Sequence, residues 1–171
     1  ICGVTKLHPD IKPEADSDVG TRGETRFMRC VRAVFGRRKV VKDGDRSENL
    51  PVIPPDAKKI LIVDDDPVFI KATSLLLNQQ GYAVVAAQDG SEAIQAMREE
   101  KPSLVLMDIN LTDKSPSIDM ISWNGFSLMS WVRRFEDLRS IPIVMISSGD
   151  PLKCVRRALT GGARAFFHKS T

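Results

Sequence analysis

The stretch that decides the fold is Ile60-Leu61-Ile62-Val63, which is followed at once by Asp64-Asp65-Asp66-Pro67. Four consecutive apolar, branched residues indicate a strand that is buried on both faces, as in a parallel sheet. Three more apolar runs end beside polar residues in the same way: Leu104-Val105-Leu106-Met107 before Asp108, Ile143-Val144-Met145-Ile146 before Ser147, and Ala165-Phe166-Phe167 shortly before Lys169. Because an open α/β sheet binds its ligands at the carboxyl ends of its strands, these polar residues are candidate site residues.

The residue types at these strand ends predict a particular chemistry. Asp64, Asp65 and Asp108 would repel one another at one edge of a sheet unless a divalent cation lay among them, and carboxylate oxygens suit Mg²⁺. The hydroxyl of Ser147 and the ammonium of Lys169 at the same edge would suit a phosphoryl group. We therefore expect a site that holds Mg²⁺ and a phosphoryl group.

Segments with helical periodicity alternate with the apolar runs, which predicts parallel pairing with right-handed crossovers. We expect helices at Pro67 to Gly81, Ser91 to Glu100, Gly125 to Phe135 and Pro151 to Thr160, and a further strand at Ala83 to Ala87. In the first helix the predicted inner stripe is Phe69, Ala72, Leu75 and Leu76.

From about Lys58 to Thr171 this pattern resembles the receiver domain of two-component response regulators. The resemblance implies a doubly wound, flavodoxin-like α/β fold with five parallel strands in the order 2-1-3-4-5. It implies that Asp108 accepts a phosphoryl group, with Ser147 and Lys169 as its catalytic partners. Mg²⁺ would be held by Asp64, Asp65, Asp108 and the backbone carbonyl of Asn110, and Ser147 and Phe166 would be the switch residues.

The sequence departs from this family's usual pattern in three places. Thr112 replaces the usual proline, and about nine extra residues make an inserted loop, Asp113 to Trp123, that would overhang the site or be a tolerated surface insertion. Ser170 stands where the family usually has proline after the lysine. The sequence stops at Thr171, where a fifth helix would begin, so we expect residues 58–171 to be a receiver domain truncated at its C-terminus.

Residues 1–57 have a different character and are predicted to be an N-terminal extension or linker with one helix at about 22–35. Apolar residues recur on one face of this helix, and basic residues lie on another: Phe27, Met28, Val31, Val34 and Phe35, against Arg22, Arg26 and Arg29. Such a helix could pack on its own domain, dock into a partner, or contact a membrane through the basic stretch 22–39. A further hypothesis is that Phe27 to Phe35 covers the gap left by the missing fifth helix.

Two other functions remain open. Asp64-Asp65-Asp66 also resembles the start of haloacid-dehalogenase phosphatases, with Asp64 as nucleophile, Asp66 as general acid, and Ser147 and Lys169 binding phosphate. That alternative leaves Asp108 without a role. A pseudo-receiver that binds partners without being phosphorylated is the third possibility.

The amino-acid composition indicates the cellular compartment and the kinds of partner to expect. Three scattered cysteines favour a reducing cytoplasm and argue against a disulfide framework or a zinc site. The net charge of +3 and the lack of a recognisable binding fold give no indication of nucleic acid as a partner. The expected partners are a histidine kinase or a histidine phosphotransfer protein, and an output domain in the same chain or in another protein. We expect a switch more than an enzyme, although it could hydrolyse its own phosphoryl group.

Overall fold

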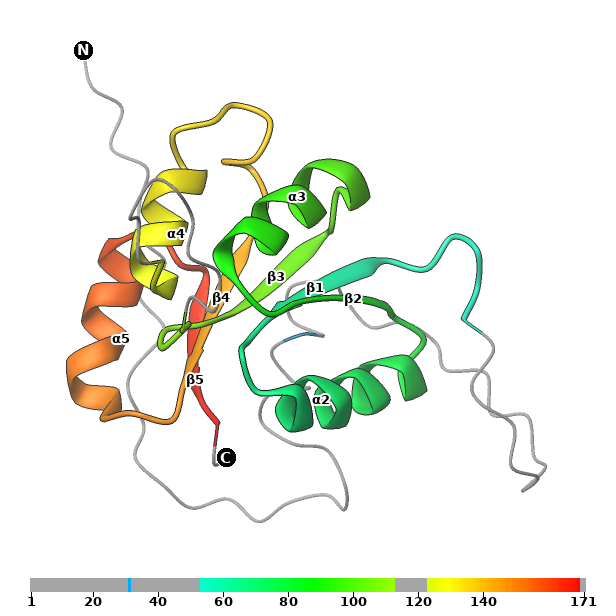
Figure 1. The fold of residues 1–171 in the computed structure, drawn as a ribbon, viewed down its shortest axis with the longest axis horizontal. Helices are drawn as coiled ribbons and strands as arrows, with labels where there is room; N and C mark the ends of the chain where they lie inside the picture. Colours follow the sequence, from blue (N-terminus) through cyan, green and yellow to red (C-terminus); the bar gives the residue numbers. More distant parts are fainter. Residues whose placement is uncertain (1–30, 32–52, 113–122, 170–171) are drawn as a thin grey trace, which may run out of the picture.

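The computed structural model describes residue 31 and residues 53–112 and 123–169. Strands and helices alternate along the chain (Figure 1): β1 (Lys59–Val63), α2 (Pro67–Gln79), β2 (Ala83–Ala87), α3 (Gly90–Glu100), β3 (Leu104–Asp108), α4 (Gly125–Val132), β4 (Ile143–Ser147), α5 (Pro151–Thr160) and β5 (Ala165–His168). All pairs of neighbouring strands are parallel, and the order is β2-β1-β3-β4-β5. The predicted fold and strand order are confirmed. β5 is the last element within the described residues.

Two helices begin with the same pair of residues, aspartate followed by proline. The side chain of Asp66 accepts a hydrogen bond from the backbone N–H of Val68 at 2.9 Å, and Pro67 is the first residue of α2. At the start of α5, the side chain of Asp150 accepts a hydrogen bond from the backbone N–H of Leu152, and Pro151 is the first residue of the helix. Both residue types fit a helix start, because aspartate satisfies a free N–H and proline has none to satisfy.

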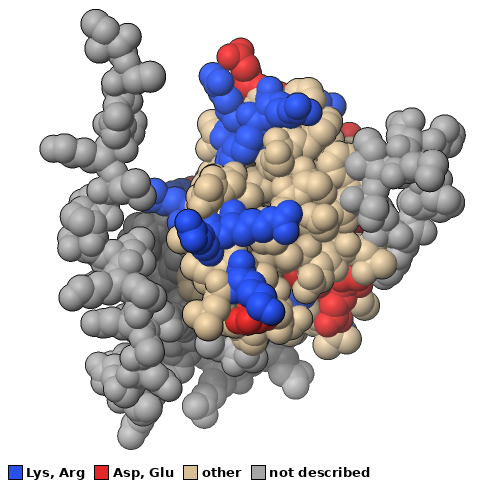
Figure 2. Space-filling view, turned by 90° about the vertical axis from the view of Figure 1, so that its left-hand side faces the viewer, with Lys and Arg blue, Asp and Glu red and all other residues tan. Residues whose placement is uncertain are grey.

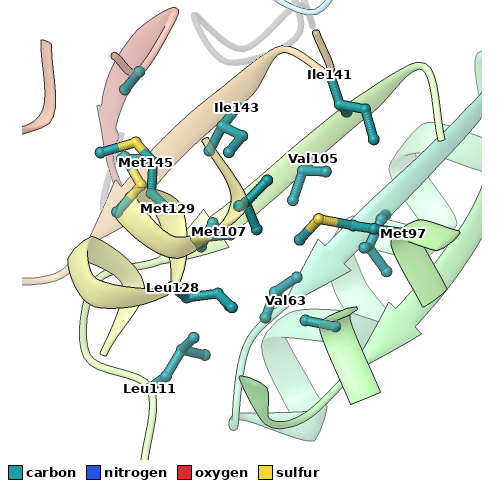
Figure 3. Close-up of a cluster of buried hydrophobic side chains, with 14 of the residues drawn as sticks. Val63, Met97, Val105, Met107, Leu111, Leu128, Met129, Ile141, Ile143 and Met145 are labelled. Atoms are coloured by element: carbon teal, nitrogen blue, oxygen red, sulfur yellow. The ribbon is translucent and has the colours of Figure 1, made fainter. Parts of the chain in front are cut away.

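The face of the sheet that carries α3, α4 and α5 has the larger apolar core. Figure 3 shows Met97 of α3 and Leu128 and Met129 of α4 lying over Val105 and Met107 of β3. The next residues along each strand point to the opposite face, as the two-residue period of a strand requires. The central strands β1, β3 and β4 are therefore buried on both sides, as predicted.

The opposite face carries α2, whose predicted inner stripe is wrong. Leu75 and Leu76 are 48% and 44% exposed, and the buried residues of the helix are Thr73 and Leu77, with Ile70 packed beside them. The observed stripe follows the same helical period but starts one residue later. One residue is about 100° of helix rotation, which a sequence rich in consecutive leucines does not define.

The third predicted helix is shorter than expected. It ends at Val132, and turns lead on through Phe135 to the start of β4. Arg133 stabilises these turns, because its guanidinium donates to the carbonyl oxygens of Arg139 and Ile141. Side-chain contacts across a turn of this kind have no signature in helical periodicity.

The predicted helix at about residues 22–35 lies outside the described residues, with the exception of Val31, which is helical and buried. Residues 113–122 of the inserted loop and Ser170 also lie outside them. None of the described helices is long and apolar enough to cross a membrane.

Candidate functional site

The predicted site residues meet at the carboxyl edge of the sheet. Asp64 follows β1, Asp108 ends β3, Ser147 ends β4, and Lys169 follows β5. The first three are buried, and the side chain of Lys169 is 17% exposed. These four residues come from four parallel strands, so their convergence depends on the sheet as a whole.

Three carboxylates form a group that could hold a cation. Asp64, Asp65 and Asp108 each offer an oxygen, and these atoms lie within 4.8 Å of one another. Oδ1 of Asp108 is buried and has no hydrogen-bond partner in the described part of the chain. A buried carboxylate oxygen without a partner is costly, so the residues present fit a hard divalent cation such as Mg²⁺.

Lys169 neutralises part of this acidic group. Its Nζ lies 2.7 Å from Oδ2 of Asp64 and donates a hydrogen bond of 3.0 Å to Oδ2 of Asp108. The same ammonium lies 4.7 Å from the centre of the Phe69 ring, on α2. Two carboxylates and an aromatic face therefore hold the lysine in one position at the edge.

Both members of the closest ion pair have shifted pKa values. Burial raises the pKa of Asp64 above its usual 3.8, and the nearby charge of Asp108 adds to the rise, although the contact with Lys169 and a hydrogen bond from the backbone N–H of Asp66 oppose it. Burial acts to lower the pKa of Lys169, but its hydrogen bonds to Asp64 and Asp108 outweigh burial and raise it. The lysine therefore stays charged at neutral pH, and burial makes the charged form of Asp64 less stable than in water.

Ser147 is joined to the neighbouring loop and to β5. Its Oγ accepts a hydrogen bond of 3.0 Å from the backbone N–H of Gly149, and its carbonyl oxygen accepts one of 2.9 Å from the backbone N–H of Lys169. A hydroxyl that accepts one hydrogen bond can still donate one. Ser147 thus has a proton to offer to a ligand, and the loop that follows it is bonded to the same oxygen.

Phe166 of β5 is partly buried and packs against the larger core, opposite Met145 of β4 in the sheet register. Phe167, the next residue, packs on the other face. The structure therefore gives Phe166 an ordinary packing role, and its role as a switch residue remains a prediction.

Asn110 is exposed in the loop after β3, and the role of its carbonyl oxygen as a metal ligand also remains a prediction.

Asp66 is outside the acidic group. It is exposed, and it caps α2 through its hydrogen bond with Val68. The phosphatase alternative needs Asp66 to act as an acid beside Asp64, whereas the group of three carboxylates that could hold a cation brings Asp108 to Asp64 instead.

Sequence reasoning missed Gly125 and Trp123 as supports of the site. A Cβ on Gly125 would lie 2.1 Å from the carbonyl oxygen of Asp108, and the Gly125 N–H donates to the carbonyl of Ile109 at 3.0 Å. Trp123 is buried in the larger core, where its ring lies against Gly90 and meets Trp131 edge-on at 5.9 Å. The last residue of the inserted loop is therefore anchored in the core, and α4 begins in direct contact with the backbone of Asp108.

Known proteins share both this sequence pattern and this fold. Residues 60–171 match the family described as the response regulator receiver domain. The polar-differentiation response regulator DivK of Brucella ovis is 30% identical over 112 residues, which are 66% of this chain and 84% of DivK.

Two solved structures agree with this match. The BeF3-activated N-terminal receiver domain of Klebsiella pneumoniae RstA is 30% identical, with a TM-score of 0.57 over 67% of this chain and 87% of that chain. A CheY-like receiver domain protein from Methanospirillum hungatei is 27% identical, with a TM-score of 0.56 over 67% and 83% of the two chains. The sequence match over most of the described residues and the same strand order lead to one conclusion: this chain belongs to the family of response regulator receiver domains, which are signalling switches.

Proposed function

We propose that this domain accepts a phosphoryl group on Asp108 from a phosphohistidine of a histidine kinase or a histidine phosphotransfer protein. The environment of the Asp108 side chain supports this proposal most directly. Its carboxylate is buried among two further carboxylates, one oxygen bonds Lys169, and the other has no partner in the described residues.

The transfer would form a bond between an Asp108 carboxylate oxygen and phosphorus while the phosphorus–nitrogen bond of the donor histidine breaks. Bound Mg²⁺ would supply positive charge against the phosphoryl oxygens. Asp64 and Asp65 would hold it, together with Asp108 and the carbonyl oxygen of Asn110. Lys169, already beside Asp108, would pair with a phosphoryl oxygen, and its charge is retained at neutral pH.

The switch would begin at Ser147. A hydrogen bond donated by its hydroxyl to a phosphoryl oxygen would draw Oγ toward the site, together with the N–H of Gly149 that donates to the same oxygen. The loop before α5 would move toward the site, and Phe166 would turn into the space vacated. The domain would thus shift between two packings of α5 and β5.

The surface around α5 is basic, which bears on the kind of output partner. Lys and Arg side chains gather on the face seen in Figure 2, which is the α5 side of Figure 1. Lys153, Arg156 and Arg157 line a shallow depression of about 480 Å³ with Thr160 and Gly161. A partner surface that carries acidic residues would complement this basic face. The cysteine content favours a cytoplasmic location for both proteins.

The test is phosphorylation by a small donor. Purified protein is incubated with acetyl phosphate and Mg²⁺, and the intact mass is measured beside an Asp108→Asn variant and an Asp66→Asn variant. We expect one base-labile phosphoryl group on the wild type and on Asp66→Asn, and none on Asp108→Asn. Asp66→Asn is a matched control because Asp66 is exposed and caps α2, and asparagine also caps helices.

Two other outcomes would support the alternatives. A folded wild type that neither gains mass nor releases phosphate would be a pseudo-receiver. Phosphate release that requires Asp64 and Asp66, but persists in Asp108→Asn, would indicate the phosphatase.

A further inference from the structure

On the face of the sheet that carries α2, the strands that α2 does not cover are also buried. Its buried residues run from Ile60 and Ile62 of β1 through Leu104 and Leu106 of β3 to Val144 of β4. Among the strands, α2 packs mainly against β2, which is at the opposite end of the sheet from β5. On the other face, α3, α4 and α5 together bury the strands. A further element must therefore cover β3 and β4 beside α2.

Val31 identifies that element. It is helical, it is 2% exposed, and it belongs to the same apolar cluster as Leu104, Leu106 and Val144. We propose that residues 27–35 form a helix that docks on this face of the sheet, beside α2. The N-terminal segment would then be part of the receiver core, in addition to being a linker.

The sequence around Val31 suits this position. Its apolar residues have the spacing of one helical face, and they are Phe27, Met28, Val31, Val34 and Phe35. Nine helical residues are about 14 Å long, close to the length of about 16 Å that a five-residue strand covers. Arg22, Arg26 and Arg29 fall on a different face of the predicted helix, where solvent can hydrate them.

The connection to β1 also favours this segment over a separate partner. An extended chain reaches about 3.3 Å per residue, so the residues between Phe35 and Lys59 can span the whole domain. A tether of this kind gives the segment an effective concentration in the millimolar range. The docking does not require phosphoryl acceptance at Asp108, so either proposal can fail without the other.

Hydrogen exchange on the unmodified 171-residue protein is the first test. We expect the amides of residues 27–35 to exchange at least a hundredfold more slowly than in an unfolded peptide, with protection lost when the sheet unfolds. Exchange at the rate of an unfolded peptide in the folded protein would overturn the proposal. If those amides are unprotected and the protein sediments as a dimer, a second copy covers the face instead.

A pair of variants tests the contact itself. Val31→Asp should raise the equilibrium constant for unfolding in urea at least tenfold, which is about 1.4 kcal/mol. Val68→Asp is the matched control: Val68 is 74% exposed on α2, and its variant should stay within threefold of the wild type. If Val31→Asp does not fold, Val31→Ala should still raise the constant several-fold. An unchanged constant in either Val31 variant would rule out the docking.

Discussion

Lys169 and Asp64 form an ion pair of 2.7 Å although their strands are not neighbours. Lys169 follows β5 and Asp64 follows β1, and β3 and β4 lie between those strands in the sheet. The lysine reaches across the carboxyl edge and also bonds Asp108 at the end of β3. One side chain therefore connects three strands at the site, which makes the charge balance there a property of the assembled sheet.

Because its ammonium lies beside two of the three carboxylates that could bind a metal, Lys169 should weaken cation binding. We predict that Lys169→Met raises the affinity for Mg²⁺ by about fivefold, or about 1 kcal/mol, as measured by isothermal titration calorimetry. Lys153→Met removes a lysine on α5 whose side chain is 85% exposed, and it should leave the affinity unchanged. Weaker binding in Lys169→Met would mean that the lysine organises the carboxylates instead of opposing the cation.

The raised pKa of Asp64 predicts a pH dependence of stability in the absence of Mg²⁺. Between the unfolded value of 3.8 and its higher folded pKa, Asp64 binds more protons in the folded state than in the unfolded state. Its contribution is therefore fully present below pH 3.8 and is lost as the pH rises through the folded pKa.

Urea unfolding in EDTA, from pH 3.5 to pH 7.5, would measure this loss. The free energy of unfolding of the wild type should fall relative to that of Asp64→Asn as the pH rises. If the free energy of unfolding of the wild type rises relative to that of Asp64→Asn as the pH increases, the pKa of Asp64 is not raised in the folded protein.

Gly125 should be intolerant of a side chain. In Gly125→Ala the new Cβ would meet the backbone carbonyl of Asp108, which cannot move without displacing the end of β3. We predict a loss of at least about 3 kcal/mol in the free energy of unfolding, because backbone must shift to relieve the overlap. Gly81→Ala is the control: its left-handed φ of 77° costs about 1 kcal/mol, but no atom lies within 4 Å of the new Cβ. Equal losses in urea unfolding would show that the overlap is easily relieved.

Arg133 should contribute more to stability than its neighbour Arg134. The Arg133 guanidinium donates to the carbonyls of Arg139, Ile141 and Gly162, and so joins the turns after α4 to the loop before β5. Arg133→Met should lower the free energy of unfolding by about 2 kcal/mol, because these carbonyls lose a charged donor.

The matched change at the exposed Arg134, Arg134→Met, should stay within about 0.5 kcal/mol of the wild type. Thermal or urea unfolding of the two variants gives the comparison. Similar small effects of both changes would mean that water replaces the guanidinium without cost.

Some features of the site could have been found with a fuller reading of the sequence. Trp123 precedes the helix cap Asn124 and lies five residues before Leu128, which is the spacing of a hydrophobic staple at a helix start. Both Trp123 and Leu128 belong to the larger core. The close approach of Gly125 to Asp108 has no such signal, because it depends on how α4 sits over the end of β3.

The amino-acid sequence by itself determined the alternation of strands and helices, the strand order through its family resemblance, and the residue type at each strand end. These follow from local patterns of apolar and polar residues, which act over a few positions of the chain. Only the tertiary structure decided which side of α2 is buried, because the rotation of a helix depends on what it packs against. It also decided that Lys169 contacts Asp108, 61 positions away, and that Val31 shares a core with β3 and β4. Such contacts depend on distances that exist only when all five strands are assembled.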